Sequence, residues 1–134
     1  VNTHSSESAC QFMINGGSYI EVSNSDFFDN EGSVFCMDSS SVFKGDNLIA
    51  ENNHTTYMGG FLNTTGDTEL SNSFVNDNSA DVSGGGVVTS HNEFLSTNNC
   101  FANNTPYDIF QADVDLDYDF DCKDFTCDTD GCEE

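Results

Sequence analysis

The sequence predicts an all-β chain folded as a parallel β-helix, a solenoid of about four to five coils with about 22–26 residues in each coil. Two recurring phrases carry this prediction: an apolar residue three positions before an asparagine, and a pair of glycines before apolar residues. The third observation is that no stretch carries the apolar stripe of an amphipathic helix. Repeats at a period of this size are typical of solenoids, in which each coil pairs with the next.

The asparagine phrase occurs four times and predicts an internal ladder. Its copies begin at Phe27, Ile49, Val75 and Phe101. Their asparagines, which lie 22, 26 and 26 residues apart, are Asn30, Asn52, Asn78 and Asn104. Asparagine tolerates the left-handed backbone of a tight corner, and stacked side-chain amides can hydrogen-bond along a column. We therefore expect these four residues to lie at one corner of successive coils.

Three short strands are predicted in each middle coil. An alternating stretch lies ahead of each asparagine and predicts a half-buried strand, and a second short apolar run follows it. The alternating stretches are Tyr19-Ile20-Glu21-Val22, Ser41-Val42-Phe43-Lys44, Thr68-Glu69-Leu70-Ser71 and Glu93-Phe94-Leu95-Ser96. The third strand follows the glycines, where Gly59-Gly60-Phe61-Leu62 returns 26 residues later as Gly85-Gly86-Val87-Val88. We expect these glycines at a corner where a positive φ or a close backbone approach excludes a Cβ.

Taken together, the two phrases resemble the repeats of the polymorphic outer-membrane protein family. The resemblance covers about residues 17–112, and two copies carry both phrases. The other copies depart from the pattern, because Gly32-Ser33-Val34-Phe35 keeps one glycine and Pro106-Tyr107-Asp108-Ile109-Phe110 keeps none. The resemblance implies that the β-helix is right-handed and displayed at a cell surface, often in adhesion. The family pattern contains no catalytic residue and therefore supplies none here.

The charge of the chain excludes two classes of partner. Two lysines, no arginine and 24 acidic residues give a formal net charge of −22. Nucleic-acid phosphates require a basic face, and anionic membrane surfaces attract basic segments. We therefore expect no nucleic-acid partner and no membrane insertion. Self-repulsion at this charge density favours bound counterions, which calcium could supply.

Six cysteines in a small acidic chain indicate an oxidising compartment, and their spacing predicts three disulfides. Cys10 and Cys36 are 26 residues apart and Cys100 and Cys122 are 22 apart, so each pair spans about one coil. The remaining pair, Cys127 and Cys132, would close a short loop at the tail. An alternative is a metal site formed by Cys122, Cys127 and Cys132, although no histidine is suitably placed.

Three sequons predict N-linked glycosylation at Asn53, Asn63 and Asn103. Together with the cysteines they favour a secreted glycoprotein that is extracellular or lies at a cell surface. The sequence carries no signal peptide or transmembrane segment, so we expect a mature product or a piece of a longer secreted protein. No cofactor is expected to be required, beyond N-linked glycans and weakly bound Ca²⁺.

The chain divides into a polar N-terminal arm or partial coil (1–16), the β-helix repeats (17–112), and an acidic last strand with a cysteine-rich tail (113–134). Residues 113–121 alternate aspartate with apolar residues, which predicts a strand with its carboxylates on one face. These carboxylates belong to Asp113, Asp115, Asp117, Asp119 and Asp121. One interpretation is a solvated edge that discourages strand pairing. The other is a ridge that binds Ca²⁺ weakly, since neither an EF-hand loop nor a nonapeptide calcium repeat is present.

The sequence favours a structural or binding role over catalysis. We assign no catalytic residue, because His4, His54 and His91 lack metal-ligand spacing and no Ser-His-Asp or Cys-His order stands out. A polysaccharide-active enzyme is kept as a remote alternative, by analogy with other β-helices. The first hypothesis is an extracellular structural subunit whose open ends self-associate head to tail into a filament or surface coat. The second is a monomeric display or adhesion module of a larger secreted protein, which would bind other surface proteins or glycans.

Overall fold

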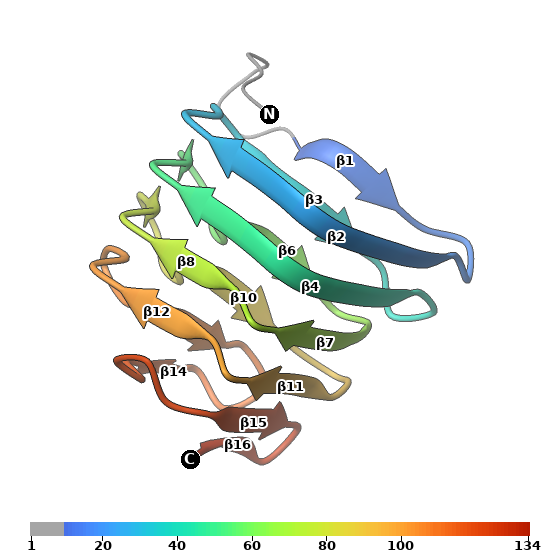
Figure 1. Cartoon of the computed structure of the whole chain (residues 1–134). Helices are drawn as coiled ribbons and strands as arrows, with labels where there is room; N and C mark the ends of the chain where they lie inside the picture. The colour runs from blue at the N-terminus through green and yellow to red at the C-terminus, as the bar shows by residue number, and fades with distance from the viewer. Residues whose placement is uncertain (1–9) are drawn as a thin grey trace.

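The computed structural model describes residues 10–134, and this part of the chain contains only strands, turns and bends (Figure 1). The first sheet contains β1 (Cys10–Ile14), β3 (Ser33–Met37), β6 (Leu62–Thr64), β10 (Val87–Thr89), β13 (Ile109–Gln111) and β14 (Leu116–Tyr118). The second contains β2 (Tyr19–Phe28), β4 (Val42–Glu51), β7 (Asp67–Ser71), β8 (Phe74–Asn76), β11 (Phe94–Thr97), β12 (Cys100–Ala102), β15 (Phe125–Asp128) and β16 (Gly131–Glu133). A third, small sheet pairs β5 (His54–Thr55) with β9 (Ser79–Ala80).

The strands stack in parallel from one coil to the next, which confirms the predicted β-solenoid with about four turns. In β2 and β4 the two predicted strands of a coil merge into one strand of 10 residues, whereas later coils break there into separate strands. The right-handed sense implied by the resemblance stays a prediction. Residues 1–9, including His4 and most of the predicted arm, lie outside the described residues, and the first described segment is strand β1.

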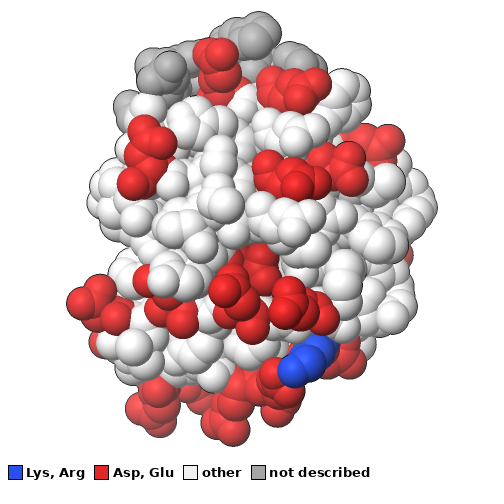
Figure 2. Space-filling view, turned by 90° about the vertical axis from the view of Figure 1, so that its left-hand side faces the viewer, with Lys and Arg blue, Asp and Glu red and all other residues white. Residues whose placement is uncertain are grey.

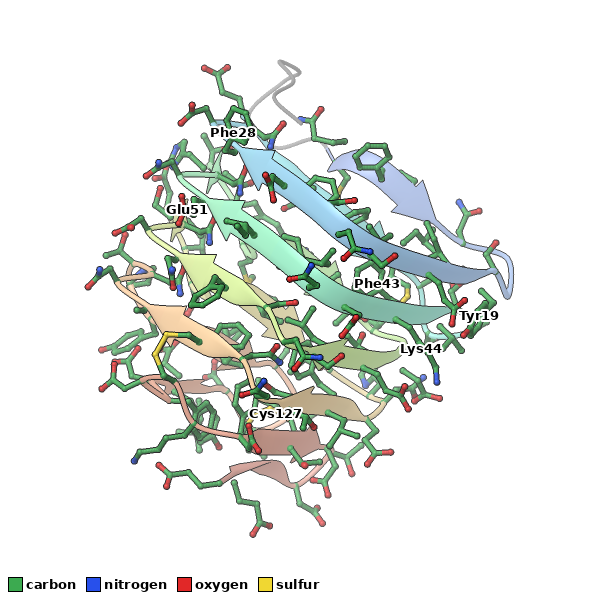
Figure 3. All side chains as sticks on the ribbon, viewed as in Figure 1. Tyr19, Phe28, Phe43, Lys44, Glu51 and Cys127 are labelled. Carbon is green, nitrogen blue, oxygen red and sulfur yellow. A yellow bond between two sulfur atoms is a disulfide. The ribbon has the colours of Figure 1, made fainter. Side chains whose placement is uncertain are left out.

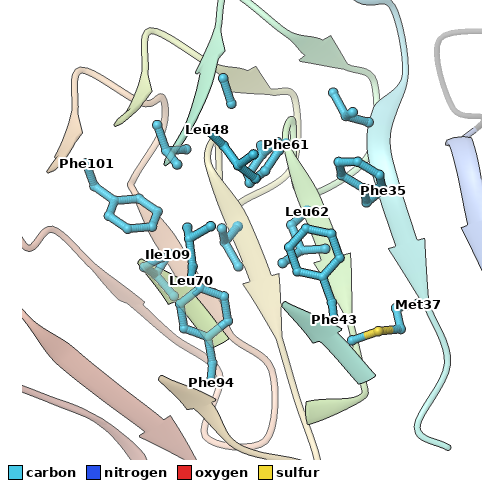
Figure 4. Packing of buried hydrophobic residues seen from close by; sticks show 14 of the residues in the cluster. Phe35, Met37, Phe43, Leu48, Phe61, Leu62, Leu70, Phe94, Phe101 and Ile109 are labelled. Carbon is cyan, nitrogen blue, oxygen red and sulfur yellow. The ribbon is translucent and has the colours of Figure 1, made fainter. Parts of the chain in front are cut away.

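Between the sheets lies a continuous core of aromatic and aliphatic side chains (Figure 4). Phe35, Phe43 and Phe61 fill the N-terminal coils, and Phe94 and Phe101 continue the column toward the C-terminal end. Phe35 makes ring contacts with both Phe43 and Phe61, with centroids 5.1 Å and 5.8 Å apart. Strand alternation sends every second side chain inward, so a narrow coil can be filled by large residues from two facing sheets.

An asparagine ladder runs through the solenoid, but one predicted member is wrong. Asn30 donates through Nδ2 to Oδ1 of Asn53, Asn53 donates to Asn78, and Asn78 donates to Asn104, at 2.6 Å, 2.8 Å and 3.0 Å. Asn52 is instead exposed, with a φ of 56°. The apolar residue that marks this copy is therefore the buried Ala50 and not Ile49, which is 38% exposed.

The glycine phrase also shifts by one residue. Leu62 pairs with Val87, 25 positions later, and the Gly59 and Gly60 amides donate to the Gly84 and Gly85 carbonyls. The predicted role holds in both of its forms. Gly84 has a φ of 60°, and a Cβ on Gly85 would lie 2.4 Å from the carbonyl oxygen of Thr105. Only glycine lets the two coils approach this closely at the corner.

The C-terminal segment closes the solenoid. Strand β14 pairs antiparallel with β13, β15 pairs antiparallel with β11, and β16 folds back on β15. The ring of Phe125 lies 5.6 Å from Phe94 and 5.3 Å from Phe101, and Phe120 stacks on Phe125 at 4.2 Å. These antiparallel strands and buried rings, which we call the C-terminal cap (residues 113–134), cover the apolar end of the last coil.

The predicted continuous acidic strand over 113–121 is wrong. Residues 112–115 form a turn, and only Leu116–Tyr118 is strand. Asp115 and Asp121 have φ values of 54° and 40°, which breaks the period-2 alternation that would align all five carboxylates. The aspartates therefore do not form one row.

All three predicted disulfides are present. They join Cys10 to Cys36, Cys100 to Cys122 and Cys127 to Cys132. The first bond connects the first two coils, the second ties the last full coil to the cap, and the third closes the β15–β16 hairpin. Free cysteines are absent from the described residues, so the alternative of a cysteine metal site is not supported. Three disulfides in a chain of this size indicate an oxidising environment.

Candidate functional site

The outer face of the second sheet carries a shallow acidic groove. It lies over β2, β4, β7 and β11, on the side that faces the viewer in Figure 3. In the parallel register, outward side chains of successive coils come into line, about 4.8 Å apart. One such row contains Glu21, Lys44, Glu69 and Leu95.

This row divides the groove into two hollows, of about 180 Å³ and 330 Å³. The smaller is lined by Val42, Lys44, Asp67, Thr68, Glu69, Glu93 and Leu95. The larger is lined by Glu21, Val22, Ser23, Lys44, Gly45, Asp46, Glu69 and Ser71. Both hollows run across several coils, parallel to the stacking direction, so an elongated partner could contact the same kind of position repeatedly.

An ion pair between Lys44 and Glu69 lies at the centre of the groove. The Nζ of Lys44 lies 2.6 Å from Oε2 of Glu69, and this hydrogen bond and charge raise the pKa of Lys44. The hydroxyl of Tyr19 donates to Oε1 of Glu21 at 2.7 Å, which raises the pKa of Tyr19. The ring of Tyr19 is 58% exposed at the edge of the groove. Figure 3 shows Tyr19 and Lys44 at neighbouring ends of β2 and β4.

The groove carries a strong excess of negative charge. Its lining contains one basic side chain, Lys44, against five acidic ones: Glu21, Asp46, Asp67, Glu69 and Glu93. Hydrogen bonds from Asn72 and Ser71 lower the pKa of Asp46, so this carboxylate is held in its charged form. Acidic residues are also scattered over the neighbouring face of the molecule, where Figure 2 shows a single basic patch toward the lower right.

The described histidines lie at separate corners outside the groove. His91 pairs with Asp113, with Nδ1 and Oδ1 2.8 Å apart, and the backbone N–H of His91 lowers the pKa of that carboxyl. The Nδ1 of His54 lies 2.9 Å from the hydroxyl of Ser79. Each ring thus contacts a neighbouring coil.

The five predicted metal-binding aspartates are dispersed. Asp113 contacts His91, Asp117 accepts a hydrogen bond from Ser83, and Asp119 accepts one from the Asp108 amide. Asp115 and Asp121 lie in turns. Within residues 10–134 no group of three or more metal-binding side chains comes together.

The three sequon asparagines lie in different surroundings. Asn53 is a ladder residue with 0% exposure, and its Nδ2 donates to both Asn78 and the carbonyl of Phe27. This burial and these hydrogen bonds disfavour a glycan on Asn53 in the folded protein. Asn63 is partly exposed on β6, and Asn103 is exposed at a corner with a φ of 56°.

The sequence pattern does not predict the groove. It indicates only that four of the residues in or beside the groove belong to alternating strands, namely Tyr19, Glu21, Lys44 and Glu69. Correct alignment of the coils would have placed Glu21, Lys44 and Glu69 on one row, because they share a register position in β2, β4 and β7.

Comparisons with known proteins give no family assignment. No family model, no curated protein and no solved structure matches this chain. No helix in the described part of the chain is long and apolar enough to cross a membrane.

Proposed function

We propose that this chain is a non-catalytic, secreted or cell-surface display and adhesion module whose outer groove binds a basic segment of another surface protein. The observation that carries this proposal is the groove itself, an exposed sheet face with five carboxylates around a single lysine. A surface of one charge sign attracts partners of the opposite sign and raises their rate of association. The net charge of −22 adds to this attraction.

The C-terminal cap is an argument for a monomeric module and against a filament subunit. Head-to-tail growth requires both ends of the solenoid to offer open strands and an apolar core. At the C-terminal end, Phe120 and Phe125 already cover the core and are 5% and 2% exposed. The strands at this end also turn antiparallel.

Binding to an immobilised basic polypeptide such as polylysine, measured over a salt series, tests the proposal. The variant Glu21→Gln/Glu93→Gln removes two groove charges, and the matched control Asp29→Asn/Asp77→Asn removes two exposed charges at a distant corner. We expect the groove variant to bind about tenfold more weakly and the control to bind nearly as the wild type does. If both variants lost the same binding affinity, the interaction would depend only on net charge, and this would contradict a binding site in the groove.

One experiment tests both the filament hypothesis and the calcium-binding hypothesis. Electron microscopy of the native chain in millimolar calcium, and again after chelation, would reveal filaments and their dependence on the cation. Dispersed particles under both conditions are the result expected for the module. Filaments lost on chelation would favour the structural subunit and assign a role to the dispersed aspartates.

A further inference from the structure

The turn between β1 and β2 contains Asn15-Gly16, the one Asn-Gly pair in the 134-residue sequence. Both residues are exposed, and Gly16 has a φ of 68°. A Cβ built on Gly16 would meet nothing within 4 Å, so no neighbouring atom crowds its Cα. Because glycine has no side chain of its own, its backbone nitrogen can approach the side chain of the preceding asparagine with little steric hindrance.

Hydrogen bonds act on both ends of the peptide group that joins these residues. Its carbonyl, on Asn15, accepts a hydrogen bond from Oγ of Ser18 at 2.5 Å. Its N–H, on Gly16, donates to Oδ2 of Asp38 at 2.8 Å. A donor on the oxygen and an anionic acceptor on the N–H both favour loss of the amide proton.

Asp38 is held in place as an anion. Its Oδ1 accepts hydrogen bonds from the hydroxyls of Ser40 and Ser41. The hydrogen bond from Ser41, followed by those from Gly16 and Ser40, lowers the pKa of Asp38 to about 2. The carboxylate is therefore charged at neutral pH and points at the Gly16 N–H.

We propose that Asn15 is a site of spontaneous deamidation, promoted by Asp38 and Ser18. The hydrogen bond to Asp38 polarises the Gly16 N–H, hydroxide from the solvent takes the proton, and the nitrogen attacks Cγ of Asn15 to form an N–C bond. The Cγ–Nδ2 bond then breaks, ammonia leaves with a proton taken from water, which regenerates the hydroxide, and a cyclic imide remains. Water opens the imide to aspartate or isoaspartate, so no oxidant or reductant is needed.

The product changes the junction between the first two coils. The Gly17 and Ser18 amides donate to the hydroxyls of Ser40 and Ser41 at 3.0 Å and 3.1 Å, which joins the coils at this corner. Deamidation adds a carboxylate beside Asp38, and the isoaspartyl form also lengthens the backbone by one carbon. Both changes oppose the Gly16–Asp38 hydrogen bond, so the first coil is expected to loosen as the protein ages.

The test follows deamidation of the whole folded chain during incubation at neutral pH in heavy-oxygen water. Peptide mass spectrometry measures the label and the amide-to-acid mass change at Asn15, and enzymatic methylation measures isoaspartate. Asn24 and Asn72, each exposed and followed by serine, serve as comparators within the chain. The variants are Asp38→Asn, Ser18→Ala and, as a control that removes one exposed carboxylate at another corner, Asp29→Asn.

We expect Asn15 to convert well before Asn24 and Asn72, about tenfold more slowly in Asp38→Asn, and several-fold more slowly in Ser18→Ala. Asp29→Asn should keep most of the wild-type rate. Circular dichroism establishes that each variant is folded, and Ser18→Ala decides the outcome if Asp38→Asn is not. Unchanged or faster conversion in the folded variants would overturn the proposal, because the hydrogen bonds would then be neutral or would restrain the turn. Conversion of Asn24 or Asn72 as fast as Asn15 would overturn it too.

Discussion

The side-chain amide of Asn104 donates to Oδ1 of Asp108 at 2.7 Å, so the internal asparagine ladder ends on a carboxylate. The other oxygen of Asp108 accepts a hydrogen bond from the backbone N–H of Phe120, a residue of the C-terminal cap. Asp108 is 2% exposed. One buried side chain therefore connects the repeat corner of the solenoid to the segment that closes it.

Asp108 should make stability depend on pH. Burial raises its pKa above 3.8, against the hydrogen bonds from Asn104 and Phe120. The folded state thus holds this proton more tightly than the unfolded state. The contribution is fully present below pH 3.8 and is lost as the pH rises through the raised pKa.

Urea unfolding of the wild type and Asp108→Asn, from about pH 4 to neutrality, checks this dependence. Relative to Asp108→Asn, the wild type should lose stability as the pH rises. Asp77→Asn, at an exposed corner, is the control for net charge. A wild-type advantage that grows with pH would contradict the assignment.

Removing an internal ladder residue should be costly. Asn53→Ala removes the hydrogen bonds that the Asn53 side chain makes with the Phe27 carbonyl and with the side-chain amide of Asn30. Each buried hydrogen bond lost in this way costs about 1–3 kcal/mol, so the free energy of unfolding should fall by about 2–6 kcal/mol. Denaturant unfolding measures this. Asn52→Gly at the adjacent exposed position keeps the positive φ and should change little; a similar loss there would mean that the ladder is not the cause.

The disulfides should differ in their contributions. Loop-closure entropy gives about 3.5 kcal/mol for a loop of the size that Cys10–Cys36 closes and about 2 kcal/mol for one of five residues, as in Cys127–Cys132. Paired serine variants, Cys10→Ser/Cys36→Ser and Cys127→Ser/Cys132→Ser, can be compared by thermal unfolding. The first pair should lower the midpoint more. The reverse order would show that the hairpin of the cap is the weaker element and depends on its bond.

Glycan occupancy should follow exposure. When the chain is made in a eukaryotic secretory host, Asn63 and Asn103 should carry N-linked glycans, whereas buried Asn53 should not. Peptide mass spectrometry before and after glycan removal gives the occupancy at each site. Thr55→Ala, Thr65→Ala and Thr105→Ala each abolish one sequon and serve as controls. A glycan on Asn53 in folded protein would be incompatible with the ladder.

The sequence by itself determined the architecture, since its repeats predicted stacked strands, a corner asparagine, close-packed glycines and all three disulfides. The sequence also contains a signal for the correct register between successive coils. A second, exposed asparagine column (Asn24, Asn47, Asn72 and Asn98) precedes the ladder by six residues in every coil. Both columns therefore share spacings of 23, 25 and 26, a signal that would have selected Asn53 over Asn52.

Only the tertiary structure decided which side chains meet across coils and how the stack ends. Glu21, Lys44 and Glu69 are more than 20 positions apart from one to the next, and a shift of one residue would reverse the face of each strand. The aspartates of 113–121 alternate like a strand, but pairing with β13 and the packing of Phe120 on Phe125 turn the chain back. Local alternation fixes the period of a strand, whereas the burial of an apolar end fixes where the strand must stop.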